Sequence, residues 1–397
     1  MMERRKNLND KFGFVEIMEV SLNEIGEIIT GNTPSKSDTN FWNSPDICFI
    51  KPDVIAEDEI TELLDSNEYI SENARNKARI VNENSILVTC IGSIAKIGIV
   101  KIRECAFNQQ INAIIPNKNI DTKYLCYCLQ NSKVKLKAIA NAPVVPIINK
   151  KQFGEFVVKI DGDISTQKKI VNRLDYIQSV ITLYKIQLQK FDDLIKARFV
   201  EMFGDPIINP YGFPVKKIDE VAVLNKGITY SPDDISKEGI IVLRSGNIKG
   251  NAFDLEDIVR ISKKISNDKL VNENDILMCN RNGSVNLVGK VAKIPKLEEK
   301  MTFGTFMTIV RSEIFEYLFV FFQMNAFREQ IKFQTAVAIN QISLPLLASV
   351  KVPIPTNELI KEFADFVEQV DKSREAVKKS LEKTQQLYDS LMQEYFG

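Results

Sequence analysis

The sequence contains no histidine among its 397 residues. Histidine is the side chain that most often serves as a general base near neutral pH and as a metal ligand in proteins. Its absence excludes Ser-His-Asp and Cys-His catalytic arrangements and removes the most common zinc ligand. A catalytic function is therefore disfavoured for this chain.

Cysteine and long apolar runs are also scarce. The six cysteines, at positions 48, 90, 105, 126, 128 and 279, include no Cys-x-x-Cys pair, and we interpret them as reduced thiols. Tyr317–Phe322, the longest apolar run of the most hydrophobic stretch, is far shorter than the ~20 residues that span a bilayer. Residues 1–12 carry charges throughout and show no apolar signal core. We expect a cytoplasmic protein.

Positive and negative charges balance, because Lys plus Arg and Asp plus Glu each total 52. A uniformly basic nucleic-acid-binding coat is thereby excluded, and any such surface must be a local patch. The first part of the chain is nevertheless segregated: Lys36 and Lys51 are the only bases in residues 19–72, whereas residues 73–151 hold 13 bases and three acids. As a group these bases can neutralise phosphates, although any one of them can equally belong to a solvated face.

Three short motifs come near to known active-site signatures without matching them. Gly283 and Gly289-Lys290 are spaced wrongly for a phosphate-binding loop, and Val291 replaces the Ser or Thr that reaches magnesium. Asn209-Pro210-Tyr211 has only part of an amino-methyltransferase motif, and no Gly-x-Gly-x-x-Gly loop accompanies it. Glu298-x-Lys300 has no acidic partner at the spacing of a nuclease site. We predict no catalytic residue, no bound metal and no cofactor held by this chain.

An internal repeat organises the sequence. Glu201-Met202-Phe203-Gly204 recurs as Glu394-Tyr395-Phe396-Gly397, and each copy follows apolar positions that alternate in steps of four and three for about four heptads. Two long helices, at residues 165–203 and 357–396, are therefore expected to pack together. Arg374 and Thr384 interrupt the second seam, where polar residues can fix register. The predicted interface consists of Ile170, Leu174, Ile177, Ile181, Leu188, Phe363, Val367, Val370, Val377 and Leu381.

The segments before these helices repeat as well. Gly92-Ser93 with Gly98 matches Gly283-Ser284 with Gly289, and each pair follows a short apolar run. Other matches pair Ile148-Asn149-Lys150 with Ile339-Asn340-Gln341, and Leu22, Ile25, Ile28 and Gly31 with Ile218, Val221, Leu224 and Gly227. Short alternating strands bounded by turn residues, with one helix apiece near residues 122–140 and 313–333, indicate α+β units.

The predicted architecture is α+β, with two pseudo-repeated units separated by two long helices that pair as an antiparallel coiled coil. At ~150 residues per domain the length allows two or three domains. We expect globular units at residues 1–163 and 205–355, and long helices at 164–204 and 356–397. An antiparallel pairing would place the units at opposite ends of a rod.

Three loops carry side chains suited to reading bases, since arginine pairs with guanine, and asparagine or glutamine with adenine. They are Cys279–Ser284, Phe107–Gln110 and Arg244–Asn247. The alternative interpretation is a set of Ser-Gly and Asn-Gly turns that need a positive φ angle. The predicted DNA-binding residues are Lys36, Ser93, Lys96, Gln109, Gln110, Arg244, Asn247, Asn280, Arg281, Asn282 and Ser284.

With these features, the chain resembles the specificity subunit of a type I restriction–modification enzyme along essentially its whole length. The order of phrases carries the resemblance: Gly31–Lys36, Phe41-Trp42-Asn43, the two Gly-Ser turns, Asn108-Gln109-Gln110 and the Met202-Phe203-Gly204 helix end. The second unit departs from it, because it lacks the Thr-Pro-Ser and Phe-Trp elements. Divergence between the two domains is what the family implies, since each reads a different half-site.

The resemblance implies a non-catalytic subunit with two target-recognition domains that bind the two halves of a bipartite double-stranded DNA site. The helix pair would set the length of an unread spacer. Methylation subunits, two in number, and restriction subunits would be its partners, and S-adenosylmethionine, ATP and magnesium would belong to them. Two rival functions remain: a coiled-coil scaffold without DNA specificity, which would show no salt-dependent DNA affinity, and a fused endonuclease, which would cut DNA with magnesium.

Overall fold

The computed structural model describes residues 17–140, 145–332 and 341–397, which form two compact units. Unit 1 combines residues up to 183 with residues 380–397, and unit 2 spans residues 184–379. Two long helices, α6 (Ile164–Phe203) and α10 (Asn357–Phe396), each contribute residues to both units. No helix in the described part of the chain is long and apolar enough to cross a membrane.

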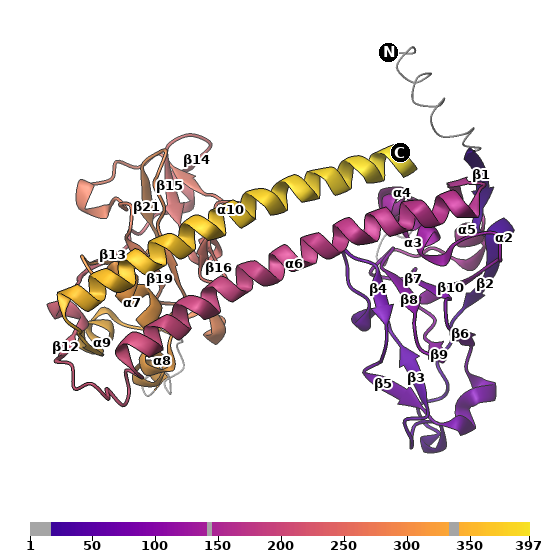
Figure 1. The fold of residues 1–397 in the computed structure, drawn as a ribbon, viewed down its shortest axis with the longest axis horizontal. Coiled ribbons are helices and arrows are strands. Elements are labelled where there is room, and N and C mark those ends of the chain that lie inside the picture. Colours follow the sequence, from indigo (N-terminus) through magenta and orange to yellow (C-terminus); the bar gives the residue numbers. More distant parts are fainter. Residues whose placement is uncertain (1–16, 141–144, 333–340) are drawn as a thin grey trace, which may run out of the picture. The chain divides into compact units, whose positions relative to one another are not determined.

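Unit 1 contains three sheets and several short helices (Figure 1). The five-stranded sheet has the order β2 (Gly26–Thr30), β10 (Ile111–Pro116), β7 (Ile86–Thr89), β8 (Ile97–Val100) and β4 (Thr61–Leu63). The four-stranded sheet has the order β5 (Glu68–Ile70), β3 (Ile47–Ile50), β9 (Glu104–Phe107) and β6 (Ile80–Asn82), and β1 (Ile17–Ser21) pairs with β11 (Val157–Asp161). Its short helices are α2 (Leu22–Ile25), α3 (Thr122–Asn131), α4 (Lys133–Ile139) and α5 (Lys150–Gly154), and its 3₁₀ turns are η1 (Thr39–Phe41), η2 (Pro52–Val54) and η3 (Glu72–Lys77).

Unit 2 repeats this plan with shorter strands. One sheet has the order β13 (Val223–Lys226), β22 (Met307–Arg311), β19 (Ile276–Cys279) and β20 (Val291–Lys293). A second has the order β14 (Ile235–Ser236), β18 (Arg260–Ile261), β15 (Ile240–Leu243) and β21 (Met301–Phe303), and the remaining pairs are β12 (Val215–Lys217) with β23 (Lys351–Pro353) and β16 (Ile248–Lys249) with β17 (Ala252–Phe253). Its helices are α7 (Phe315–Phe321), α8 (Asn325–Lys332) and α9 (Leu344–Ser349), and its 3₁₀ turns are η4 (Ile218–Glu220), η5 (Pro232–Asp234), η6 (Ser245–Asn247), η7 (Asn267–Lys269) and η8 (Val285–Leu287).

The two units share strand order and register. The order β2-β10-β7-β8 recurs as β13-β22-β19-β20, and the parallel pair β3–β9 recurs as β15–β21. Val81–Leu87 and Val271–Leu277 have matching sequences, and Asn84 and Asn274 within them both adopt a positive φ, of 65° and 70°. The predicted α+β pseudo-repeat is confirmed.

In each unit one central strand separates two apolar cores. Ile86 and Val88 of β7 pack with α3 and the long helices, while Leu87, on the opposite face, packs with Phe107 in the core between the sheets. In unit 2, Ile276 and Met278 face the helices and Leu277 faces the second sheet. A strand buried on both faces reads as a continuous apolar run, which is why both runs stand out in the sequence.

The regions expected to hold one helix apiece hold two. In unit 1, α3 ends at Asn131, and Ser132 leaves helical geometry with φ −89° and ψ 4° before α4 begins at Lys133. In unit 2, α7 ends at Phe321 and α8 begins at Asn325. Serine and asparagine compete with the helix by bonding to nearby backbone, which favours a break at residues 131–132. Residue 333 of the second predicted helix lies outside the described residues.

Local chemistry fixes the ends of α6. The hydroxyl of Ser165 donates to the carboxylate of Asp163, and so do the backbone N–H groups of Ser165 (3.0 Å) and Thr166 (3.2 Å) and the hydroxyl of Thr166. Together these bonds lower the pKa of Asp163 to about 2. At the other end Gly204 has φ +73°, and its N–H donates to the Val200 carbonyl at 2.8 Å. A glycine in this conformation is a common helix stop, and it explains the glycine that follows Phe203 at the end of α6.

Within each unit, α6 and α10 pack antiparallel. In unit 1, Leu174, Ile177 and Ile181 are buried with Tyr388 and Met392 of α10. The guanidinium of Arg173 donates to the Tyr395 hydroxyl at 2.6 Å, so the start of α6 lies beside the end of α10.

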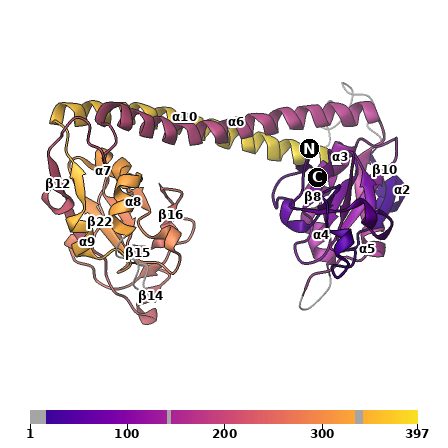
Figure 2. The same ribbon diagram turned by 90° about the horizontal axis from the view of Figure 1, so that it is seen from below.

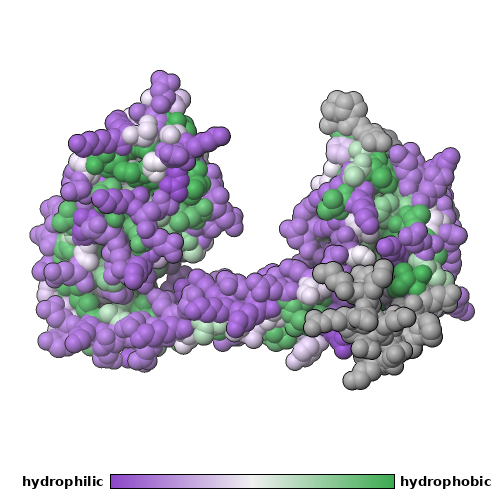
Figure 3. Space-filling view, turned by 90° about the horizontal axis from the view of Figure 1, so that it is seen from above, coloured by the Kyte–Doolittle hydropathy of each residue, from purple (hydrophilic) through white to green (hydrophobic). Residues whose placement is uncertain are grey.

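In unit 2 the helices α6 and α10 are also antiparallel. Phe363, Val367 and Val370 of α10 are buried with Phe199 of α6. Arg198 donates to Glu362 at 2.7 Å. The side of the long helices seen in Figure 3 is mainly hydrophilic.

The remaining positions of the predicted seam are half-buried. Ile170 and Leu381 border the unit 1 core, and Leu188 and Val377 belong to unit 2. Arg374, which interrupts the apolar pattern, donates to Asp192 of α6 at 2.7 Å. A polar seam residue here has a specific partner, as expected for one that fixes register.

Candidate DNA interface

Three loops of unit 2 meet at one edge of its sheets, which we call loop edge 2. They are residues 244–247 after β15, residues 280–290 after β19, and the turn 304–306 between β21 and β22. β15 and β21 are parallel, so their carboxyl ends meet at the same edge. β19 runs antiparallel to β22, so its last residue, Cys279, pairs with Met307 at the start of β22. Within this unit β14 and β15 lie well away from α10 (Figure 2).

Hydrogen bonds join these loops. The Gly304 N–H donates to the Leu243 carbonyl at 2.9 Å, and the Asn280 N–H donates to the Phe306 carbonyl at 3.0 Å. The side-chain amide of Asn282 donates to the Ser245 hydroxyl at 3.0 Å. The loops therefore form one surface.

Unit 1 has an equivalent surface, loop edge 1, made by residues 31–36 after β2, 51–54 after β3, 90–96 after β7 and 108–110 between β9 and β10. The Cys90 N–H donates to the Gln110 carbonyl at 2.7 Å, and the Asn108 N–H donates to the Ile50 carbonyl at 3.1 Å. These bonds correspond to those of Asn280 and Gly304 in unit 2. The backbone frame of the loop edge is thus duplicated.

Gly31 and Gly227, which the sequence repeat matches, each lie against the backbone of a neighbouring loop. A Cβ on Gly31 would lie 2.2 Å from the Asn108 carbonyl oxygen, and one on Gly227 would lie 2.0 Å from the Gly304 carbonyl oxygen. Glycine is required at both positions because the backbone of one loop approaches the backbone of the next.

Of the residues predicted to bind DNA from unit 2, Arg281, Asn282 and Ser284 lie at the surface of loop edge 2. Arg281 and Ser284 are exposed, and Asn282 is half-buried through its bond to Ser245. The guanidinium carbon of Arg281 lies 5.0 Å from the centre of the Phe306 ring. Arg244 is half-buried and donates to Asp257 at 2.8 Å.

Asn247 and Asn280, which the sequence also predicts to bind DNA, are buried within the loops. Asn247 is 1% exposed: its side-chain oxygen accepts from the Arg244 N–H, and its amide donates to the Asp254 and Asp257 carbonyls at 2.9 and 3.0 Å. Asn280 is 6% exposed and donates to the Thr308 hydroxyl at 3.0 Å. Both amides shape the loops from inside, a common role of short polar side chains in turns.

In unit 1 the predicted residues all belong to loop edge 1. Ser93 and Gln109 are exposed, and the Thr33 hydroxyl donates to Gln109 at 2.7 Å. Gln110 is half-buried and accepts from the Asn108 amide at 2.9 Å. Lys96 donates to the Pro52 carbonyl at 3.3 Å, which ties the loop after β7 to the loop after β3.

The other predicted cation of this edge, Lys36, is exposed. Its ammonium lies 5.1 Å from the centre of the Trp42 ring and 3.5 Å from the Glu68 carboxylate. A hydrogen bond from Lys51 lowers the pKa of Glu68, with Lys36 adding a smaller contribution, so the carboxylate is charged at neutral pH. Lys36 is thus held near the edge by one aromatic ring and one carboxylate.

The glycine turns are only partly as expected. Gly92 has φ +75°, as a left-handed turn residue, whereas Gly246 and Gly283 are not among the positive-φ glycines. Gly289, which the sequence repeat matches with Gly98, has φ +78° and instead occupies the place of Ala95 (φ 64°), because the Ala95 N–H donates to the Thr89 carbonyl as the Gly289 N–H donates to the Cys279 carbonyl. The identical Gly-Ser spacing of the two units therefore does not produce identical loop conformations.

Part of the segregated charge of the first unit is paired internally. Lys137 pairs with Glu57 at 3.0 Å, and its hydrogen bond lowers the pKa of that carboxyl group. Lys123 lies 3.4 Å from Glu62 and 3.0 Å from Asp175. The acidic segment thus binds part of the basic segment, and fewer cations are free for phosphates than the sequence suggests.

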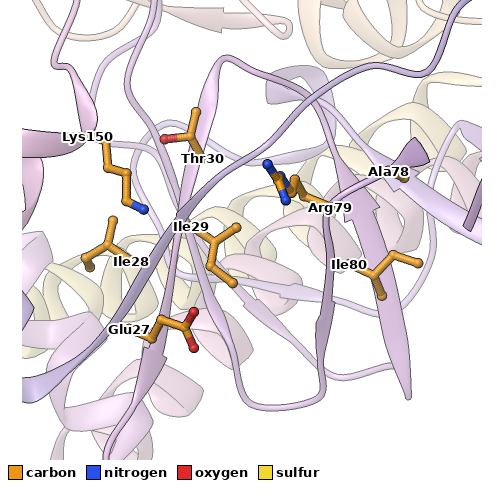
Figure 4. Close-up of a pocket in the computed structure, with 8 residues that line it drawn as sticks. All are labelled: Glu27, Ile28, Ile29, Thr30, Ala78, Arg79, Ile80 and Lys150. Carbon is orange, nitrogen blue, oxygen red and sulfur yellow. The ribbon is translucent and has the colours of Figure 1, made fainter. Parts of the chain in front are cut away.

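A pocket of about 510 Å³ lies between the edge strands β2 and β6 of unit 1 (Figure 4). Its polar lining consists of Glu27, Thr30, Arg79 and Lys150, and its apolar lining of Ile28, Ile29, Ala78 and Ile80. No group of three or more metal-ligating side chains occurs in the described residues. The cysteines are free, and burial raises the pKa values of Cys90 and Cys105 to about 12, so these thiols are protonated and unreactive.

Comparison with known proteins identifies the family. A family model described as the type I restriction modification DNA specificity domain matches twice, at residues 15–190 and 210–386. The specificity subunit of the Escherichia coli type I restriction enzyme EcoR124I/EcoR124II is 31% identical over 169 residues, which is 40% of each protein. The MjaIX specificity subunit of Methanocaldococcus jannaschii is 21% identical over 373 residues, 87% of this chain and 85% of that protein. Alignment with the bacterial relative thus covers about two fifths of its length.

Solved structures show a similar fold. The type I restriction–modification S subunit from M. genitalium has a TM-score of 0.50 at 14% identity, with 96% of each chain covered. A chain from a study of assembly and conformational transition of the type I R-M system has a TM-score of 0.59 at 12% identity, with 97% of this chain and 99% of that chain covered. The predicted family is confirmed: the chain belongs to the type I restriction–modification DNA specificity family and carries two copies of its domain.

Proposed function

We propose that this chain is the DNA-specificity subunit of a type I restriction–modification complex. It binds a bipartite double-stranded DNA site, with loop edge 1 on one half-site and loop edge 2 on the other, and it has no catalytic role of its own. The observation that carries the proposal is the duplicated loop frame: Cys90–Gln110 and Asn280–Phe306 make the same backbone hydrogen bond in the two family domains.

The exposed side chains of the two loop edges differ, which supports recognition of a different DNA sequence by each edge. Loop edge 1 presents Ser93 and Gln109, whereas loop edge 2 presents Arg281 and Ser284. Glutamine pairs best with adenine, and arginine with guanine. A frame that stays constant while its exposed polar groups change is what two half-sites of different sequence require.

The cations of the edges fit phosphate contacts. Lys36 and Lys96 lie at loop edge 1, and Arg244 lies at loop edge 2. Phosphate contacts position a protein on DNA without reading its sequence. Because the net charge of the chain is zero, its affinity for DNA is expected to arise from these local cations.

The proposed partners follow from the family. We infer a complex with methylation subunits, two in number because the chain carries two copies of the domain, and with restriction subunits. S-adenosylmethionine, ATP and magnesium are assigned to those partners, in agreement with the lack of histidine and of matching cofactor motifs in the sequence. The lengths of α6 and α10 are proposed to set the unread spacer between the half-sites.

Methylome sequencing tests the function directly. Cells that express the chain with its co-encoded methylation subunit are expected to carry one bipartite methylated motif, absent when either chain is omitted. A methylated motif without two separated halves, or methylation that does not depend on this chain, would contradict the proposal. A scaffold without DNA specificity, which the family does not favour, predicts no change in the methylome.

The purified chain provides the second test. Without partners it is expected to neither transfer methyl groups from S-adenosylmethionine nor cut DNA in the presence of magnesium. Magnesium-dependent cutting would favour the fused endonuclease, and methyl transfer would refute the non-catalytic assignment.

A further inference from the structure

Phe306 is a half-exposed aromatic residue at the tip of a tight turn in loop edge 2. The Met307 N–H donates to the Gly304 carbonyl at 2.8 Å, which closes the turn and leaves the Phe306 side chain 50% exposed. The neighbouring Phe303, on strand β21, is fully buried. The turn therefore presents an apolar ring to the surroundings at an edge where Val285, in the loop after β19, is also exposed.

The backbone register shows which residue of unit 1 corresponds to Phe306. In unit 1 the Ile111 N–H donates to the Asn108 carbonyl at 3.2 Å, and the Gln110 carbonyl accepts from Cys90. In unit 2 the Phe306 carbonyl accepts from Asn280 in the same position of the turn. Phe306 thus occupies the place of Gln110.

Phe306 also has a close neighbour with defined base chemistry. The guanidinium carbon of Arg281 lies 5.0 Å from the ring centre, and the Arg281 N–H donates to the Phe306 carbonyl at 3.3 Å. Within residues 17–140, 145–332 and 341–397, no carboxylate forms an ion pair with Arg281. Successive base pairs of DNA are ~3.4 Å apart, so two groups at this separation can address neighbouring base pairs.

We propose that Phe306 is a specificity-determining residue that contacts the 5-methyl group of a thymine next to the guanine read by Arg281. The proposal rests on the proposed function and deepens it. A phenylalanine ring has no hydrogen-bonding group, and the thymine methyl is the apolar group that the major groove offers to it. The base step read by this turn is then a thymine beside a guanine.

The thymine methyl can be removed without any other change, by replacing thymine with deoxyuridine. The experiment measures binding of the chain, in complex with its methylation subunit, to duplexes that carry the mapped motif with one thymine at a time replaced. Burial of one methyl-sized group is worth ~0.8 kcal/mol, which is about a fourfold change in affinity. We expect this loss at one thymine beside a guanine, and no loss at that position for Phe306→Ala.

Matched variants separate base contact from a structural effect. Val223→Ala is the control, because it removes another exposed apolar side chain of unit 2. Val223 lies on β13 and pairs with Arg311, at the end of β22 away from Phe306. This variant should keep the full loss of affinity on deoxyuridine substitution. Phe306→Leu keeps an apolar side chain and should keep part of it. If Phe306 only supports Arg281, the penalty at every thymine will be the same in Phe306→Ala and in the unmodified protein, and the proposal is overturned.

Two further outcomes are decisive. A motif in which no thymine responds to deoxyuridine, or in which the responding thymine has no guanine neighbour, would also overturn the assignment of Phe306 while leaving the specificity function intact. Failure of the proposed function would look different: the unmodified complex would bind duplexes with and without the motif equally.

Discussion

Replacement of Arg281 by alanine should weaken recognition of one half-site and leave the other unchanged. Arg281 is exposed at loop edge 2, stacked 5.0 Å from the Phe306 ring and anchored through its backbone. A bidentate arginine–guanine pair is worth ~1–3 kcal/mol of discrimination, which is about a 5- to 150-fold change in affinity. Because the stacked guanidinium is already oriented, little side-chain entropy is lost on binding, so the upper part of this range is expected.

Competition binding measures this prediction. The complex with the methylation subunit is titrated with a duplex carrying the full motif and with duplexes altered at one base pair at a time. Arg281→Ala should bind the intact motif more weakly and should no longer distinguish guanine from other bases at one position. Lys216→Ala serves as the charge-matched control, because Lys216 is an exposed cation of β12 outside loop edge 2.

Salt dependence reveals the alternative role. Removal of a lysine or arginine that contacts a phosphate lowers affinity for all sequences alike and reduces the slope of log affinity against log salt by about one unit. If Arg281→Ala behaves in this way, or if both half-sites lose discrimination equally, Arg281 is not a base-reading residue and the reasoning is refuted.

Three other changes test the fold and its use. Phe199→Ala removes a fully buried ring stacked 4.9 Å from Tyr317 and should destabilise unit 2 by ~3–5 kcal/mol; a calorimetric transition that does not shift would contradict this packing. Gly227→Ala places a Cβ 2.0 Å from the Gly304 carbonyl oxygen and should abolish reading of one half-site in the methylome, so an unchanged motif would show that the close approach is unimportant. Insertion of seven residues into both α6 and α10 preserves the heptad phase and adds ~10 Å to each helix. A longer unread spacer or lost activity is expected, whereas altered half-site bases with the old spacing would show that the helices do not set it.

Much of the fold could be predicted because its signals are local. The heptad pattern and the Phe-Gly endings locate α6 and α10 to within a residue of their bounds in the structure. The matched Gly31 and Gly227 depend on backbone approach, which tolerates no side chain in either copy. Signals of this kind survive divergence because they are set by backbone geometry.

The site was harder to predict because its side chains are sorted by contacts distant in sequence. Asn280 is buried through Thr308, and Asn247 through the carbonyls of Asp254 and Asp257. A search for amide and guanidinium groups selects both asparagines equally with the exposed Arg281. Phe306 escaped the same search because it carries no polar group. The match of Val81–Leu87 with Val271–Leu277 is the signal that could have revealed it, since it fixes the register of the two units.

The difference between backbone contacts and side-chain contacts also explains how one fold can read two sequences. Backbone groups carry the frame of each loop edge: Cys90 N–H to Gln110 in one unit, Asn280 N–H to Phe306 in the other. A backbone bond places no demand on the side chain at the turn tip, so a glutamine and a phenylalanine can occupy the same position. Specificity can therefore change at the tip without cost to the two cores, whereas a change at Gly31 or Gly227 disturbs the whole edge. Exchange of Phe306 for glutamine, the residue of unit 1, is accordingly expected to leave the fold intact and to move the preference at one base pair from thymine toward adenine.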